Sequence, residues 1–153
     1  MACILMYTLI HATPEQCFDL SRDTEVHLLS TRHTHERVVA GRSRGLFEAG
    51  DTVTWEAVHL GIRQQLETRI SRFDRPHFFE DVMVKGAFRS MRHEHHFREE
   101  GDGTIMTDIF DYTLPAGPLG QLFDWLYLKG YMMRLLEKRN RMIKAIAEKD
   151  RLR

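Results

Sequence analysis

The sequence predicts an α+β fold in which a curved antiparallel sheet encloses a long C-terminal helix. Between residues 36 and 114, apolar and polar side chains alternate and turn residues interrupt the pattern, as in a meander of strands. Residues 119–149 follow a proline-rich break and carry apolar side chains at helical spacing. The 153 residues suffice for one domain with one buried core. We therefore expect a single domain over residues 1–153.

The N-terminal part of the chain is predicted to form one strand and two short helices. Residues 2–10 are apolar but too few to span a membrane, so they read as a first strand. Thr13 is a predicted N-cap and Pro14 the first helical residue of a helix reaching about Leu20. A second short helix is predicted within residues 24–34. We expect the two helices to close one end of the sheet.

Six further strands and one long helix complete the prediction. The strands are expected at 36–43, 52–61, 64–73, 77–85, 88–98 and 104–114, which gives a seven-stranded sheet. The helix over 119–149 is roughly 45 Å long at about 1.5 Å per residue. Gly130 in its middle predicts a bend, or a close approach by ligand or sheet. The apolar stripe expected to face the sheet comprises Leu122, Phe123, Leu126, Met133, Leu136, Ile143 and Ile146.

Charge and cysteine content exclude several classes of partner. Lys and Arg number 22 and Asp and Glu number 22, so no global field attracts nucleic acid, and we expect no nucleic-acid partner. No apolar run is long enough for integral membrane association. Cys3 and Cys17 form no CxxC motif, and together with the lack of a secretion signal they favour a cytoplasmic location. The basic residues near the helix end read as a solvated surface: Lys138, Arg139, Arg141, Lys144, Lys149, Arg151 and Arg153.

Short sequence patterns along most of the chain are similar to a known superfamily. They are Pro14-Glu15-x-x-Phe18-Asp19, Gly50-Asp51-x-Val53-Thr54-Trp55, Phe79-x-Asp81-x-Met83-x-x-Gly86-x-Phe88, His93-x-His95-x-Phe97, Gly103-Thr104-x-Met106-x-Asp108 and Pro115-x-Gly117-x-Leu119-Gly120. The chain resembles the START-like helix-grip superfamily, also called SRPBCC, and above all its small stand-alone bacterial members. That superfamily includes lipid-transfer domains, pollen-allergen-like proteins and polyketide cyclase/dehydrases. The resemblance implies the helix-grip fold and a small hydrophobic ligand, lipid-like or aromatic, held between sheet and helix.

Strand periodicity assigns the side chains that should line such a cavity. Successive strand residues point to opposite faces, and the more apolar row should face the helix. Methionine and aromatic walls suit a variable apolar guest, although each such residue could equally fill the core. The predicted ligand-binding set is Trp55, His59, Phe79, Asp81, Met83, Met91, His93, His95, Phe97, Asp108, Phe110, Tyr112 and Met133.

The polar members of this set leave three roles open. They could hydrogen-bond one another, because an unpaired buried polar group costs about 1–3 kcal/mol. They could orient the polar end of a ligand. They could also transfer protons in a cyclase/dehydrase-like enzyme, the alternative to a binding protein, with His93, His95, Asp108 and Tyr112 as candidate catalytic residues.

A metal site is a further alternative that the sequence does not favour. His93 and His95 share one strand face and could bind one zinc ion together with His59 or Asp108. Because His-x-His alone is a weak signal, we expect no metal and no cofactor.

Overall fold

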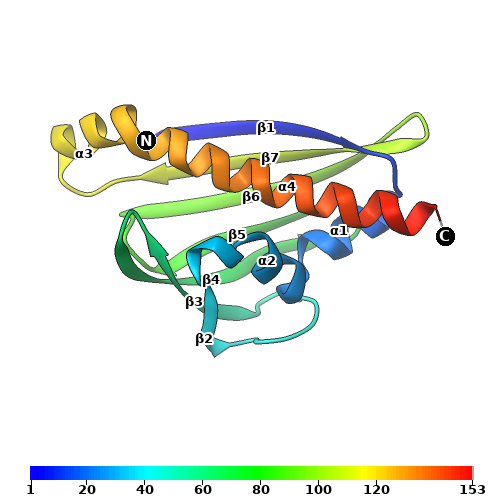
Figure 1. The fold of residues 1–153 in the computed structure, drawn as a ribbon, viewed down its shortest axis with the longest axis horizontal. Helices are drawn as coiled ribbons and strands as arrows, with labels where there is room; N and C mark the ends of the chain where they lie inside the picture. Colours follow the sequence, from blue (N-terminus) through cyan, green and yellow to red (C-terminus); the bar gives the residue numbers. More distant parts are fainter. Residues whose placement is uncertain (153) are drawn as a thin grey trace.

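The computed structural model describes residues 1–152, which form one antiparallel sheet and a long helix against it (Figure 1). Over this range seven strands pair in the order β1-β7-β6-β5-β4-β3-β2. The predicted helix-grip fold is confirmed, and every strand boundary lies within two residues of its predicted place. The strands are β1 Ala2–Ile10, β2 Arg37–Gly41, β3 Thr52–His59, β4 Ile62–Asp74, β5 Phe78–Lys85, β6 Ser90–Glu100 and β7 Gly103–Thr113.

Two short helices follow β1, as predicted, and local capping explains where they begin. In α1 (Pro14–Ser21), the hydroxyl of Thr13 accepts a bond from the Gln16 amide, and the Gln16 side chain accepts one from the Thr13 amide. This reciprocal capping box satisfies two backbone N–H groups of the first turn. Asp23 caps α2 (Thr24–Ser30) in a similar way, and a 3₁₀ turn, η1 (Arg32–Thr34), follows.

The long C-terminal helix contains an irregularity that the sequence analysis did not predict. It begins as α3 (Gly117–Phe123), continues through a π-helical segment η2 (Asp124–Leu128) and ends as α4 (Lys129–Arg151). A π turn holds an extra residue, so it changes which side chains of the helix face the sheet. Arg153 of the predicted basic helix end lies outside the described residues.

Part of the predicted apolar stripe on this helix is wrong. Leu136 and Ile143 are buried, but Leu122, Phe123, Leu126 and Met133 are exposed. The buried stripe instead follows Leu128, Met132 and Leu136, so Met133 lies about 100° around the helix from the inward-facing Met132. Gly130 is exposed, and a Cβ placed on it would meet only the tip of Arg134. The irregularity therefore lies at η2, and nothing approaches Gly130 closely.

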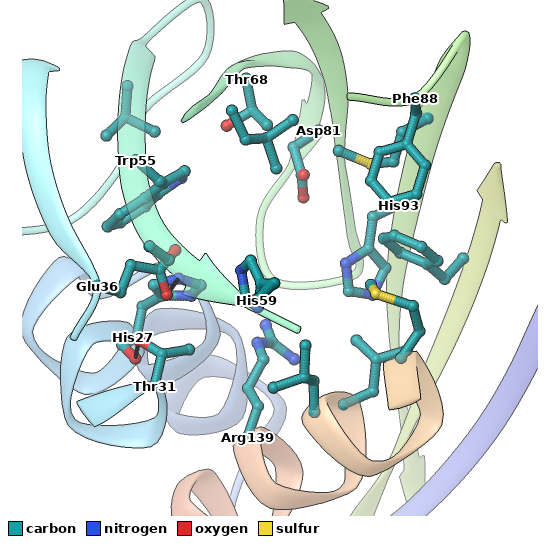
Figure 2. Close-up of a pocket in the computed structure, with 18 of the residues that line it drawn as sticks. His27, Thr31, Glu36, Trp55, His59, Thr68, Asp81, Phe88, His93 and Arg139 are labelled. Atoms are coloured by element: carbon teal, nitrogen blue, oxygen red, sulfur yellow. Dashed lines mark hydrogen bonds and ion pairs between the residues drawn. The ribbon is translucent and has the colours of Figure 1, made fainter. Parts of the chain in front are cut away.

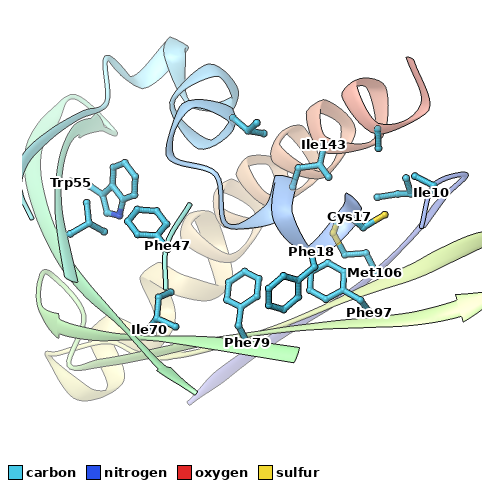
Figure 3. Packing of buried hydrophobic residues seen from close by; sticks show 14 residues of the cluster. Ile10, Cys17, Phe18, Phe47, Trp55, Ile70, Phe79, Phe97, Met106 and Ile143 are labelled. Atoms are coloured by element: carbon cyan, nitrogen blue, oxygen red, sulfur yellow. The ribbon is translucent and has the colours of Figure 1, made fainter. Parts of the chain in front are cut away.

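The main core lies between the sheet, α1 and the C-terminal half of α4 (Figure 3). Phe18 of α1 packs edge-on against Phe73, Phe79 and Phe97, with ring centroids 5.2–5.3 Å apart. Ile143 of α4 belongs to the same cluster. A second cluster under the start of α4 includes Ile4, Met91, Phe110, Tyr112, Leu128 and Leu136.

Helix α4 contacts one side of the sheet directly and diverges from the other. Its Asn140 donates to Asp108 of β7 at 2.6 Å and to Thr8 of β1 at 3.3 Å. Toward β3 and β4 the sheet curves away, and the contact there is at the rim, where Tyr131 meets His59 at 2.8 Å. A space therefore remains between α4 and the β3–β5 side. Within residues 1–152, no helix combines the length and the apolar character that crossing a membrane requires.

Candidate functional site

A cavity of about 240 Å³ lies between the helix and the curved sheet. Its walls come from α2, from strands β3 to β7 and from the η2–α4 helix, and they are mostly apolar. Trp55, Leu66, Ile70, Phe88, Met91, Phe110, Leu128, Met132 and Leu136 supply the apolar surface. The arrangement is that of a small-molecule pocket, in which a few polar groups converge on an otherwise apolar chamber.

One group of polar side chains stands beside Trp55 (Figure 2). The His27 ring packs on the Trp55 indole with centroids 4.2 Å apart, and His27 Nε2 lies 3.2 Å from the Glu36 carboxylate. Burial raises the pKa of Glu36, but His27 and a hydrogen bond from Thr31 lower it more, so the pKa lies below its usual value. Glu36 is therefore a buried carboxylate that stays ionised at neutral pH.

A second polar group faces the cavity from β5, β6 and α4. His93 Nε2 lies 2.8 Å from Asp108 Oδ1, and His95 Nε2 lies 2.8 Å from Asp81 Oδ2. Figure 2 shows Asp81 and His93 pointing into the cavity from the sheet, with Arg139 rising toward them from α4. Sheet register sets this group, because Asp81 pairs with His93, and His95 pairs with Asp108.

The charges in this cluster are compensated. Burial raises the pKa of Asp108, yet hydrogen bonds from His93 and His95, together with Arg139, hold it well below the usual range. Burial and the adjacent His95 ring lower the pKa of His93 to about 4, against the opposing effect of Asp108. At neutral pH His93 is thus a neutral imidazole that donates through Nε2–H to a carboxylate, which leaves Nδ1 as an acceptor.

Much of this lining was predicted from the sequence. Eight of the thirteen predicted residues line the cavity: Trp55, His59, Phe79, Asp81, Met91, His93, His95 and Phe110. The mutual hydrogen bonding considered for the polar set is present for His93 with Asp108 and for His95 with Asp81.

The other five predicted residues lie elsewhere. Asp108 stands behind the histidines, Phe97 packs under α1, and Met83 packs against the second cluster. The Tyr112 hydroxyl donates to Asp124 of η2, away from the cavity, and Met133 is exposed. Strand alternation assigned the correct face to the strand residues, but it does not locate the empty space along that face.

Arg139 corrects one prediction outright. It was assigned to a solvated helix end, but it is 8% exposed and reaches the cavity wall. Its guanidinium donates to the Ser21 carbonyl at 3.1 Å and the Asn140 side chain at 3.0 Å, and it lies 3.4 Å from Asp108. His27, Glu36 and Tyr131 are further cavity residues that the sequence analysis missed. His27 lies on α2, Tyr131 on α4, and Glu36 between η1 and β2, so only the fold brings them to the cavity.

One set of side chains could hold a metal ion. The ligand atoms of Asp81, His93 and His95 all lie within 4.8 Å of one another. The set differs from that considered from the sequence, since neither His59 nor Asp108 supplies the third ligand atom. Asp81 joins it because β5 pairs with β6.

Comparison with known proteins identifies the family of the chain. The profile of the family described as polyketide cyclase / dehydrase and lipid transport matches residues 10–128. The chain belongs to this family. It is a member of the START-like helix-grip superfamily, as its sequence patterns predicted. The description covers both enzymes and lipid carriers, so membership alone does not choose between catalysis and binding. No curated protein matches the sequence.

Solved structures with the same fold are distant in sequence. The crystal structure of TTHA0849 from Thermus thermophilus is 22% identical, with a TM-score of 0.74 over 95% of this chain and 99% of that one. A START superfamily protein from Mycobacterium smegmatis is 12% identical, with a TM-score of 0.70 over 96% and 97% of the two chains. The di-domain ARO/CYC StfQ from the steffimycin biosynthetic pathway is 10% identical, with a TM-score of 0.77 over 97% of this chain and 51% of that one. At these identities the likeness concerns the fold alone.

Proposed function

We propose that the protein binds a compact, mostly apolar small molecule in the cavity between the sheet and α4. The observation that carries the proposal is the contrast within the cavity wall, which is mostly apolar and carries polar clusters beside Trp55 and around His93. Such a wall suits a guest with an apolar body and a polar end. The family's description, which includes lipid transport, supports the same proposal.

The size of the cavity limits the guest. An engineered apolar cavity of roughly 150 Å³ holds benzene, and this cavity measures about 240 Å³. One or two fused rings, or a short branched acyl chain, would fill it. A long-chain lipid would need the wall to open, so we favour an aromatic or other compact guest.

The polar end of the guest is expected to carry a hydrogen-bond donor. His93 offers Nδ1 as an acceptor, because Nε2 is engaged by Asp108. Asp81, whose side chain is 20% exposed, offers carboxylate oxygens. A phenol or alcohol hydroxyl directed at these groups would gain a hydrogen bond in a site where solvent competes little.

The two tryptophans provide an internally controlled test. Trp55 lines the cavity and Trp125 is 78% exposed on the surface. In a ¹⁵N NMR titration with 2-naphthol, the Trp55 indole N–H signal should shift while the Trp125 signal stays in place. Trp125→Phe assigns the two signals. Shifts of equal size at both tryptophans, or at neither, would contradict the proposal.

A matched probe tests the polar end separately. Naphthalene has the same two rings without the hydroxyl, so 2-naphthol should bind roughly two- to tenfold more tightly, as expected for one net hydrogen bond. In His93→Ala the two probes should bind equally well. If 2-naphthol kept its advantage in that variant, the hydroxyl would not lie at His93.

Proton transfer at the same site is a second candidate function. The observation that favours it is the His93–Asp108 pair, in which a buried carboxylate orients a neutral imidazole toward an apolar cavity. His93 Nδ1 could take a proton from a carbon next to a ketone, giving an imidazolium and an enolate, and return it. Tyr112, a candidate from the sequence, does not reach the cavity.

Deuterium exchange distinguishes an enzyme from a carrier. The two-ring ketone 2-tetralone is small enough for the cavity, and NMR follows exchange at its carbons next to the carbonyl in D₂O. A catalyst should accelerate exchange in the wild type and lose the acceleration in His93→Ala. Binding without acceleration would leave the protein as a carrier.

A further inference from the structure

Two adjacent strands bring three potential metal ligands together at the sheet side of the cavity. His93 and His95 lie on the same face of β6, and Asp81 stands opposite His93 on β5. Their ligand atoms lie within 4.8 Å of one another, and both imidazoles are buried, with 6% and 2% exposed. Small side-chain rotations would bring three such atoms onto one ion, since Zn–N and Zn–O bonds are about 2.0–2.2 Å long.

The groups behind the histidines are those a metal site requires. Asp108 Oδ1 lies 2.8 Å from His93 Nε2 and 3.4 Å from His95 Nδ1. One buried carboxylate thus faces the far nitrogen of both imidazoles. Carboxylates in this position fix the orientation of metal-binding histidines and make them better ligands. Asn140 donates to the other oxygen of Asp108 at 2.6 Å and so fixes the carboxylate itself.

The nitrogens that do not face Asp108 are the ones available to an ion. With Nε2–H donated to Asp108, His93 presents the lone pair of Nδ1, and its ring faces the cavity (Figure 2). His95 Nε2 points at Asp81. A divalent ion would take the place of the proton between those two groups. The proton would move to His95 Nδ1, which lies 3.4 Å from Asp108 Oδ1. Arg139, whose Nη2 also lies 3.4 Å from His95 Nδ1, would keep its bonds to Ser21 and Asn140.

The charge of the cluster is compatible with a cation. Asp81 and Asp108 are both acidic, the two histidines are their hydrogen-bond partners, and Arg139 is the adjacent cation. Arg139 lies 3.4 Å from Asp108 Oδ1 and from His95 Nδ1, on the side away from Asp81. It offsets the charge of Asp108, while the charge of Asp81 remains available to the ion.

The geometry points to a divalent metal site, best suited to zinc, formed by Asp81, His93 and His95 and oriented by Asp108. Two imidazoles and one carboxylate leave a fourth position open toward the cavity, as in zinc sites that bind water or substrate. A metal there would interact with the polar end of a guest as a Lewis acid. The site does not depend on the proposed binding of an apolar molecule, which can be measured on metal-free protein.

Zinc binding to the purified full chain tests the site. After removal of metal with a chelator, one equivalent of Zn²⁺ should bind, as measured by elemental analysis after dialysis and by competition with a chromophoric chelator. Co²⁺ should bind with the strong visible absorption of a four-coordinate site instead of the weak absorption of the hydrated ion. If neither Zn²⁺ nor Co²⁺ bound, the metal-free protein could still bind 2-naphthol, so the two proposals fail separately.

The chain has nine histidines, and some lie on the surface. Single substitutions distinguish binding at the proposed site from binding at those surface histidines. His96 follows His95, bonds Glu94 and has 43% of its side chain exposed; His96→Ala should bind Zn²⁺ like the wild type. His93→Ala and the isosteric Asp81→Asn should bind it at least roughly 100-fold more weakly, and Asp108→Asn about 10–100-fold more weakly. Circular dichroism checks that each variant is folded. The absence of Zn²⁺ binding in the wild type, or an equal loss in His96→Ala, would overturn the proposal.

Discussion

Filling the cavity from the sheet side should leave the stability of the protein unchanged or raise it. Ala57 lies on β3 beside Trp55, is 4% exposed and lines the cavity. Ala57→Leu adds three carbon atoms directed into the open space. At about 0.8 kcal/mol per buried CH₂, complete burial without strain would stabilise the fold by roughly 2 kcal/mol. A leucine rotamer will not match the space fully. We therefore expect the free energy of unfolding of Ala57→Leu to equal that of the wild type or to exceed it by up to about 2 kcal/mol.

The same substitution in a filled part of the core provides the control. Ala12, between β1 and α1, is 5% exposed, belongs to the main core and does not line the cavity between the sheet and α4. Ala12→Leu should overpack its surroundings and lower the free energy of unfolding by about 1–3 kcal/mol. Urea denaturation of both variants measures the difference, and Ala57→Leu should also lose 2-naphthol binding. If the two variants were destabilised equally, the space beside Ala57 would be occupied by the protein itself.

Three further predictions follow from local features of the fold. Thr13→Ala removes the capping box of α1, so urea denaturation should show a loss of about 1 kcal/mol; an unchanged midpoint would contradict the role of the cap. A hydrogen bond from Arg75 is the largest of the effects that lower the pKa of Asp19. The ionised Asp19 carboxylate should therefore stabilise the fold fully above pH about 4, and this stabilisation should be lost as the pH falls through the lowered pKa. Asp19→Asn should thus lose less stability than the wild type between pH 7 and pH 3, and equal losses would refute this. Cys3 is exposed, whereas burial raises the pKa of Cys17 to about 11, so a thiol reagent at pH 7.5 should label one cysteine in the native protein and two after unfolding; rapid labelling of both would contradict the buried position of Cys17.

The strands and their inward faces could be predicted from sequence because they depend on local periodicity. Trp55 and His59 share a strand face by alternation alone, and the structure places both on the cavity wall. Thr13 and Pro14 likewise define the start of α1 through interactions within one turn. In each case the determining contacts are close in sequence.

The missed features depend on contacts between distant segments. Asp81 joins His93 because β5 pairs with β6 in one particular register, which the sequence pattern did not specify. Arg139 was assigned to the surface because arginine is usually exposed, but its partners Ser21 and Asp108 come from α1 and β7. The π-helical η2 begins at Asp124, whose carboxylate accepts a bond from Tyr112 of β7.

The proposed function depends on an unfilled, mostly apolar space between α4 and the β3–β5 side of the sheet. Xenon occupies dry apolar cavities whatever their natural ligand, so diffraction from crystals of the protein under xenon pressure tests the claim directly. We predict a xenon peak among Leu66, Met132 and Leu136, absent in Ala57→Leu. Continuous side-chain density there, with no xenon bound, would contradict the account.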